Sequence, residues 1–524
     1  MTKTILSALA LVTLLFLLSN PAFAAPQTMR LDYYHTGDAA QELFSVERVV
    51  IEPLPWPGDI SKCTDDTNLG KYFFEVRDQK GKRVLYSRGF ASIYGEWETT
   101  DEAKAMMRTF HESLRFPAPE APVEVVLKKR DAKNAWREVW STPIDPKDMF
   151  IDRSKTSAAA PLITIQKMGD PRTKVDFLIL GDGYTAQEMK KFEADAHRLA
   201  KALFATSPFK EHRKDFNVWA ICPPAADSGI SRPSTGVYHD SPFGATYDAF
   251  GSERYVLTFD NRAVRKTAAF APYEFIEILA NNRTYGGGGI FNLYSTVAVD
   301  NAFANYVFVH EFGHHFAGLA DDYYTSSVAY APATDRVEPW EQNVTALLPG
   351  GASVQAPRPG SPAGVLDLPE MGAGGANVRT RGGSNQVERD TGVPPVLDSK
   401  PAQDARAILK WADLVSPNTP IPTPWAKEAF ETYSRSIQDR RRQLRKDKRP
   451  ESEMEALFKE ELAQESQMFA REKHAGRVGA FEGAMYESRG YYRPEIDCIM
   501  FSRTNHFCAV CRRTIERIID LYSN

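Results

Sequence analysis

The sequence predicts a multidomain protein in which an N-terminal all-β sandwich is followed by an α/β (or α+β) domain built around a mixed sheet. Three observations favour this fold class. The chain has 524 residues, of which 43% are hydrophobic, and this is enough for about two to four domains with large cores. Short β-rich runs fill residues 27–150, whereas buried strand patterns alternate with helical patterns from about residue 160 onwards.

Residues 1–24 have the pattern of a removable secretory signal. Lys3 precedes an apolar run over residues 5–18, and Ala22-Phe23-Ala24 places small residues two apart at the end. The apolar run is too short to anchor the chain in a membrane. We therefore expect a mature chain that begins at Ala25 and is secreted or periplasmic.

The overall charge excludes some classes of partner. There are 64 basic and 68 acidic residues, for a net charge of −4. Such a chain has no electrostatic field that would attract nucleic acid or anionic lipid. After residue 24 there is no run of about 18 consecutive apolar residues, so we expect no membrane span. These observations leave the oligomeric state open.

The N-terminal domain is expected over residues 25–155. Gly, Pro, Asp and Asn separate its β-rich runs at the spacing of a sandwich, and residues 78–81 are expected to form a hairpin turn. No group of His, Cys and carboxylate residues in this region predicts a chemical site. The expected strands are residues 43–51, 71–77, 84–93 and 123–129.

A second domain is expected over residues 160–524. A buried strand over residues 175–180 leads to Thr185, which with Glu188 is suited to cap a helix over residues 186–205. Further along, Gly, Pro, Ser and Ala dominate an expected exposed insertion, and a charged segment is expected to form helices with a break at Pro450. The further buried elements are expected at residues 217–222, 254–259 and 274–279, the insertion at 348–402 and the charged helices at 424–473.

Five cysteines are present, and secretion makes their pairing plausible. The last three lie within 14 residues, which favours a disulfide from Cys498 to Cys508 or Cys511. Alternatively, Cys508 and Cys511 form half of a structural zinc site, although no second pair is present to complete it. The odd total leaves at least one thiol free or paired with another molecule. The remaining cysteines are Cys63 and Cys222.

A motif with clear chemical meaning is His310-Glu311-Phe312-Gly313-His314, which follows a run of buried-helix pattern over residues 301–309. Positions four apart share one face of a helix, so both imidazoles can bind a single ion. Two neutral imidazoles suit zinc, and Glu311 is placed to accept a proton from a metal-bound water. Chance produces this pentapeptide in about one such chain in a hundred, so its surroundings matter.

The residues after the motif offer a third ligand. Gly318 can end the helix with positive φ, and Asp321 then presents a carboxylate to the ion. Asp322 is the rival carboxylate, and His315 is expected to point away from the ion. A ligand from a second helix would make the site gluzincin-like; its candidates are Glu338 and Glu341.

Two further segments have expected roles near this site. A metzincin has a methionine turn beneath its metal, and Met500 in Asp497-Cys498-Ile499-Met500 is the candidate. Gly286–Gly289 is not a phosphate-binding loop, because no Lys-Ser/Thr follows it. We expect these glycines to form a flexible rim beside an edge strand, to which an extended peptide can add.

Together these motifs resemble the IgA-peptidase family of secreted bacterial zinc metallopeptidases, a metzincin-related group. The resemblance spans about residues 175–515, and the N-terminal region looks like the sandwich that often precedes this catalytic domain. The family usually has Asp-Glu-Tyr where this chain has Asp321-Asp322-Tyr323. The stretches that carry the resemblance are Leu180 to Thr185, Tyr285 to Gly289, His310 to His314, Leu319 to Tyr323, Glu338 to Glu341, Pro420 to Pro424, Gly479 to Ala484, Tyr492 to Met500 and Phe507 to Cys511.

The resemblance implies a zinc metalloendopeptidase that hydrolyses protein or peptide substrates. His310, His314 and Asp321 would bind zinc, Glu311 would be the general base and Met500 the turn methionine. A tyrosine commonly helps to hold the oxyanion in related enzymes, and Tyr486, Tyr491 and Tyr492 are the candidates. The alternative is a secreted glycan- or protein-binding protein with a structural zinc site and no turnover. The presence of Glu311 argues against it, because a structural site needs no base.

Overall fold

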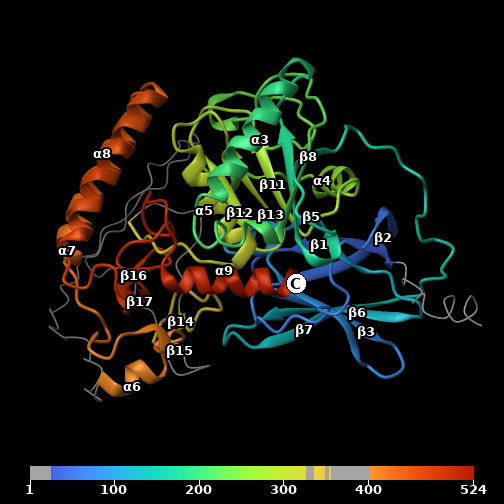
Figure 1. The fold of residues 1–524 in the computed structure, drawn as a ribbon, viewed down its shortest axis with the longest axis horizontal. Helices are drawn as coiled ribbons and strands as arrows, with labels where there is room; N and C mark the ends of the chain where they lie inside the picture. Colours follow the sequence, from blue (N-terminus) through green and yellow to red (C-terminus); the bar gives the residue numbers. More distant parts are fainter. Residues whose placement is uncertain (1–24, 326–334, 348–352, 356–401, 524) are drawn as a thin grey trace, which may run out of the picture.

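The computed structural model describes residues 25–325, 335–347, 353–355 and 402–523 (Figure 1). The predicted signal sequence lies outside these residues. The same is true of most of the predicted insertion over residues 348–402.

Two antiparallel sheets make up the N-terminal region. They confirm the four predicted strands and add β1, β5 and β7, which the sequence patterns had not indicated. One sheet has the order β2-β1-β5 and the other the order β4-β3-β6-β7. The strands are β1 (Gln27–Gly37), β2 (Glu42–Pro55), β3 (Tyr72–Asp78), β4 (Val84–Phe90), β5 (Arg108–Pro117), β6 (Val123–Arg130) and β7 (Trp136–Ile144).

The two sheets enclose a common apolar core. Alternate residues of β6, such as Val123 and Val125, point into it and share it with Leu31 of β1. The predicted hairpin turn joins β3 to β4, where the Lys82 amide donates to the Asp78 carbonyl at 2.9 Å. The region is therefore a sandwich, as predicted from the spacing of its strands.

A six-stranded mixed sheet forms the centre of the second region. Its order is β12-β13-β11-β9-β10-β8; the four central strands are parallel, and both edge strands are antiparallel to their neighbours. The mixed sheet is as predicted. Residues 254–259, predicted as a buried element, make isolated bridges and no strand, and Val256, Leu257 and Thr258 are buried. The strands are β8 (Ile163–Gln166), β9 (Val175–Asp182), β10 (Phe216–Ile221), β11 (Phe275–Ala280), β12 (Gly287–Ile290) and β13 (Tyr294–Ala298).

Two helices pack side by side on this sheet. A turn over Ala186–Glu188 precedes α3 (Met189–Leu203), and Thr185 with Glu188 forms the predicted capping box. Helix α5 (Ala304–Ala317) contacts α3 and lies across β11, β12 and β13. In the described residues, the other α-helices outside the charged segment are α2 (Ile93–Trp97), α4 (Asn261–Ala268), α6 (Ala402–Ala407) and α9 (Ala509–Tyr522).

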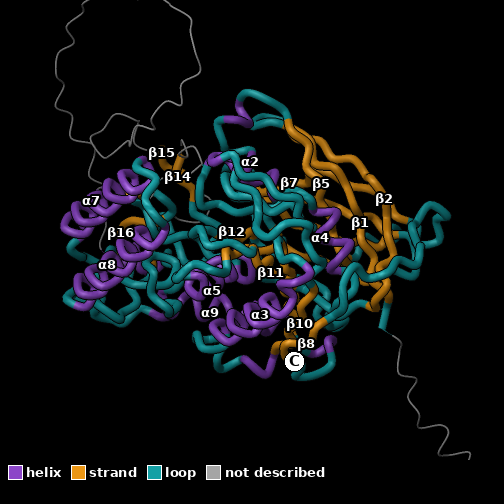
Figure 2. Tube along the Cα trace, turned by 90° about the horizontal axis from the view of Figure 1, so that it is seen from above, coloured by secondary structure: helices purple, strands orange, loops and turns teal. Residues whose placement is uncertain are grey.

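The charged segment forms two helices, α7 (Lys427–Lys446) and α8 (Glu451–Ala470), and Pro450 marks the predicted break. Arg440 of α7 pairs with Glu460 of α8 at 2.5 Å on an exposed face. These helices lie at the opposite end of the molecule from the β2-β1-β5 sheet (Figures 1 and 2). Among the described residues, no helix combines the length and the apolar character that crossing a bilayer requires. Two short antiparallel strand pairs also lie in the described residues: β14 (Asp335–Val337) with β15 (Ser353–Gln355), and β16 (Phe481–Ala484) with β17 (Glu487–Arg493).

The N-terminal region shares an apolar core with the six-stranded sheet. Tyr94, Trp97 and Phe110 belong to the same buried cluster as the strands of that sheet, and each is at most 5% exposed. The Phe110 ring lies 6.3 Å from the Phe259 ring. Folding of the two regions is therefore expected to be energetically linked.

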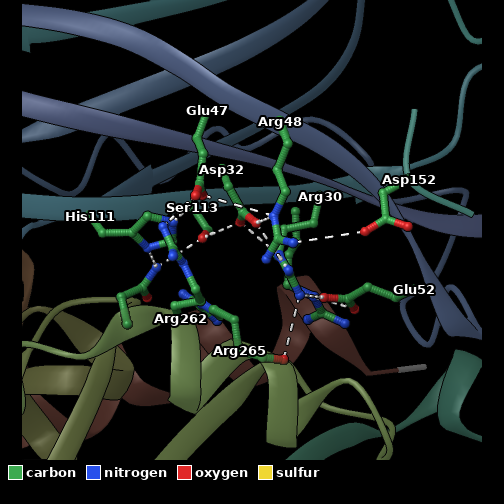
Figure 3. A network of polar contacts seen from close by, with 12 residues as sticks. Arg30, Asp32, Glu47, Arg48, Glu52, His111, Ser113, Asp152, Arg262 and Arg265 are labelled. Carbon is green, nitrogen blue, oxygen red and sulfur yellow. Dashed lines mark hydrogen bonds and ion pairs between the residues drawn. The ribbon is translucent and has the colours of Figure 1, made fainter. Parts of the chain in front are cut away.

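A network of ion pairs covers the same boundary (Figure 3). Arg30 binds Asp32 at 2.7 Å and Glu52 at 3.0 Å, and it also donates to the Arg265 carbonyl of α4 at 3.5 Å. Arg262 of α4 pairs with Glu47 of β2. Burial tends to raise the pKa of Asp32, but the Arg30 guanidinium outweighs it and lowers that pKa. The arginines thus neutralise the carboxylates of this group.

The cysteines differ from the predicted arrangement. No disulfide forms among the five, all of which lie in the described residues. Cys498 Sγ lies 3.8 Å from Cys511 Sγ, well beyond a disulfide length of about 2.05 Å. Cys508 completes the group, so three thiols meet where the sequence had suggested one pair.

Candidate metal centre

Helix α5 presents the His310–His314 motif from a buried position beside the six-stranded sheet. The helix ends at Gly318, which has φ 59° and ψ 37°, and its amide donates to the His314 carbonyl at 3.0 Å. Glycine adopts this left-handed conformation without strain, which accounts for the predicted end of the helix. The chain then turns back and brings Asp321 to the two histidines.

His310, His314 and Asp321 place three donor atoms in a nearly equilateral triangle. The two Nε2 atoms are 3.2 Å apart, and each lies 3.2 Å from Asp321 Oδ1. Tetrahedral zinc with ligands at about 2.0–2.1 Å has donors separated by about 3.3 Å. Within the described residues, Asp321 Oδ1 is buried and receives no hydrogen bond, as a ligand oxygen would. The residues present therefore fit a tetrahedral metal ion.

The opposite side of each ligand is held by a hydrogen bond. His310 Nδ1 donates to the Ile499 carbonyl at 2.8 Å, and His314 Nδ1 donates to the Leu319 carbonyl at 2.5 Å. With Nδ1 protonated, each Nε2 lone pair is free to bind a cation. Asp321 Oδ2 accepts a hydrogen bond from the Tyr486 hydroxyl.

The rival third ligands lie elsewhere. Asp322 is fully buried; its amide donates to the Met500 carbonyl at 2.8 Å, and its Oδ1 accepts from Asn343 at 3.1 Å. Glu338 pairs with Lys410 at 3.1 Å. In the described residues, the group of donors around the two histidines contains neither Asp322 nor Glu338, and it does not contain Glu341.

Met500 and His315 have the surroundings predicted for them. Met500 is buried against α5 at Gly313, where its sulfur would lie only 3.3 Å from an added Cβ. His315 Nδ1 donates to the Ile290 carbonyl at 3.1 Å, and His315 Nε2 accepts from the Ile276 amide at 3.0 Å. Burial lowers the pKa of His315 to about 3, so it is a neutral histidine that links α5 to the sheet.

Charges in this site act strongly on one another because His310 and Asp321 are buried. Burial opposes the ionised form of Asp321, but the neighbouring imidazoles of His314 and His310 outweigh it and hold the pKa of Asp321 well below its usual value. Burial raises the pKa of Glu311, although His310 and His314 act in the opposite direction. Two carboxyl groups in one site thus have clearly different proton affinities.

The ligands lie in a cavity of about 700 Å³ that Glu311 also lines. The N-terminal sandwich contributes one wall, although sequence patterns had indicated no site there. Arg254 and Tyr323 line the cavity as well, and Arg254 donates to the Tyr323 hydroxyl at 3.1 Å. Arg254 lies in the buried element predicted over residues 254–259 and Tyr323 in a stretch that carries the family resemblance, but neither had been predicted to line the site. The wall residues from the sandwich include Lys71, Gly95, Glu96, Arg130 and Asn134.

The glycine run has a different role from the predicted flexible rim. Gly287–Gly289 themselves belong to the edge strand β12 instead of forming a rim beside it, and β12 packs directly against α5. A Cβ on Gly289 would lie 2.3 Å from the Glu311 carbonyl oxygen, and one on Gly287 would lie 2.6 Å from Val307. The glycines therefore allow the strand to approach the helix that carries the metal ligands.

Comparison with known proteins agrees with this geometry. The model of the family described as IgA Peptidase M64 matches residues 163–355 and 396–519, which is more than half of the chain. The model described as Peptidase M64 N-terminus matches residues 21–141. A search of curated proteins gave no match. With its β-sheet region followed by a mixed α/β domain, this chain belongs to the IgA peptidase M64 family and is a metallopeptidase.

Proposed function

We propose that the protein is a zinc-dependent endopeptidase in which His310, His314 and Asp321 bind the ion and Glu311 is the general base. The triangle of donor atoms beside Glu311, inside a cavity, carries this proposal. Three protein ligands leave a fourth position open, as in catalytic rather than structural zinc sites. Two imidazoles and one carboxylate are also the donor types that zinc accepts.

Bound zinc would polarise the scissile carbonyl and lower the pKa of a water towards about 7. Glu311 lines the cavity next to the first ligand and takes one proton from the attacking water. The water oxygen forms a bond to the carbonyl carbon, and the carbon–nitrogen bond then breaks. Glu311 passes the proton to the leaving amine, so that the products are one carboxylate and one amine.

The substrate is proposed to be an extended segment of protein. At Gly287 the outer edge of β12 already makes backbone hydrogen bonds. The Gly287 amide donates to the Arg254 carbonyl, and the Gly287 carbonyl accepts from the Val256 amide, at 3.1 Å each. A substrate strand could therefore add to this edge only from Gly289 onwards, next to the metal ligands. The sandwich would contact the same segment from the opposite wall.

Metal removal tests the proposed activity. Casein cleavage by the full chain is expected to stop after treatment with a strong chelator and to return when zinc is added, because the open coordination position is lost with the ion. Zinc content and cleavage would be measured on the same samples. Zinc binding with no cleavage of any peptide library would instead favour the glycan- or protein-binding function.

Tyr486 is proposed to orient Asp321 through the hydrogen bond between them. The Tyr486→Phe variant is expected to bind zinc about 10–100-fold more weakly, because such supporting bonds hold a ligand in position. Competition with a fluorescent chelator measures this affinity. Tyr491→Phe is the matched control, since the Tyr491 hydroxyl contacts the Val337 carbonyl at 3.5 Å. Unchanged zinc affinity with a reduced kcat would assign Tyr486 to the oxyanion instead.

Export is proposed from the signal pattern of residues 1–24. Protein secreted or released from the periplasm of an expressing bacterium is expected to begin at Ala25. Intact-mass measurement checks this, and a full-length mass in the exported fraction would contradict it.

A further inference from the structure

Cys498, Cys508 and Cys511 form a second group of potential metal ligands beneath the candidate catalytic centre. Their sulfur atoms all lie within 4.8 Å of one another, and the residues are at most 1% exposed. We propose that these three thiolates bind a second, structural zinc ion. The presence of this ion does not depend on whether the protein is a peptidase.

The spacing of the sulfur atoms matches zinc better than a disulfide. With zinc–sulfur bonds of about 2.3 Å, two thiolates of a tetrahedral site lie about 3.8 Å apart. Cys498 Sγ and Cys511 Sγ are 3.8 Å apart. A disulfide would join two of the three and leave the third thiol buried beside it, whereas one ion uses all three.

Backbone amides are already directed at two of the sulfur atoms. The Cys508 amide donates to Cys498 Sγ at 3.2 Å, and the Cys511 amide donates to Cys508 Sγ at 3.4 Å. Cys508 is also the N-cap of α9, where the positive end of the helix dipole favours negative charge. Both features stabilise thiolates, which are the form of cysteine that binds zinc.

The three sulfur atoms supply three of the four positions of a tetrahedral zinc site. In the described residues, no further His, Cys, Asp or Glu belongs to this group. Three thiolates and one zinc ion carry a net charge of −1 by formal count. The buried Arg493 guanidinium, whose charge interacts with Cys498, would offset part of it.

This second ion would support the catalytic ligands. Cys498 is followed by Ile499, whose carbonyl accepts the hydrogen bond from His310 Nδ1 at 2.8 Å. Met500 comes next, and its carbonyl accepts from the Asp322 amide at 2.8 Å. Zinc at the three cysteines would therefore join this turn to the start of α9. It would hold in place the backbone carbonyl that accepts the hydrogen bond from His310.

Elemental analysis and thiol counting on the full chain, purified without chelator or reductant, test the proposal. We expect two zinc ions per chain and five cysteines that react with an alkylating reagent after denaturation with chelator, without any reduction. The double variant His310→Ala/His314→Ala is expected to retain one ion, because it leaves the three cysteines in place. The second site is therefore tested separately from the peptidase proposal. Loss of all zinc in the double histidine variant, or a disulfide among these three cysteines in the wild type, would overturn the second site.

Cobalt substitution identifies the ligands by an independent signal. Cobalt bound to thiolates gives an intense near-ultraviolet charge-transfer band, which imidazole and carboxylate ligands do not produce. The band is expected in the full chain and in the double histidine variant. It should weaken strongly in Cys511→Ser and persist in Cys222→Ser, a buried cysteine outside the group. A band absent from the full chain would also overturn the proposal.

Discussion

Replacement of Glu311 by glutamine is expected to lower kcat for peptide hydrolysis by about 10²–10⁴-fold, the contribution that a general base typically makes. The amide has nearly the same shape as the carboxylate but cannot accept the proton from water. The three metal ligands are untouched, and their triangle of 3.2 Å separations does not involve the Glu311 side chain. Zinc content and melting temperature should therefore remain close to those of the wild type.

Steady-state cleavage of a fluorogenic peptide, with zinc content measured on each preparation, provides the comparison. Glu193→Gln makes the same change on the exposed face of α3 and should leave kcat unaltered. A Glu311→Gln enzyme with wild-type kcat would exclude the role of general base. If zinc is lost as well, the comparison is repeated with saturating zinc, so that metal binding and proton transfer are separated.

Removal of the N-terminal sandwich is expected to prevent folding of the remaining chain. A truncated protein that starts at residue 156 lacks Tyr94, Trp97 and Phe110, which fill part of the core of the six-stranded sheet. Loss of a single buried aromatic side chain costs about 3–5 kcal/mol, and a domain has a net stability of only about 5–15 kcal/mol. The truncation also removes the ion pair between Glu47 and Arg262 of α4, and it removes one wall of the cavity.

Thermal unfolding followed by circular dichroism checks this expectation. The truncated chain should show no cooperative transition, and Trp97→Ala in the full chain should lose about 3–5 kcal/mol of unfolding free energy. Phe150→Ala, at a side chain that is 85% exposed, is the control and should change little. A soluble truncated chain that melts cooperatively and cleaves casein would make the sandwich a separable domain. The boundary expected between residues 155 and 160 stays a prediction until then.

Local patterns in the sequence were sufficient for the features that depend on near neighbours. The spacing of His310 and His314 places both on one face of a helix, and Gly318 ends that helix because glycine accepts positive φ. The capping box of Thr185 and Glu188 depends on residues three apart. These features follow from the geometry of one or two helical turns, so no distant contact is needed to predict them.

Features that depend on distant contacts were decided only by the tertiary structure. Asp321 and Asp322 are adjacent carboxylates, and only the folded chain places Asp321 Oδ1 3.2 Å from each histidine Nε2 while the Asp322 amide donates to the Met500 carbonyl, far along the chain. The contribution of Arg254 and of the sandwich to the cavity has the same origin. So does the meeting of three thiols in place of one pair. In each case the stabilising free energy of the contact comes from packing between segments far apart in the sequence. Periodicity within one segment cannot predict such packing.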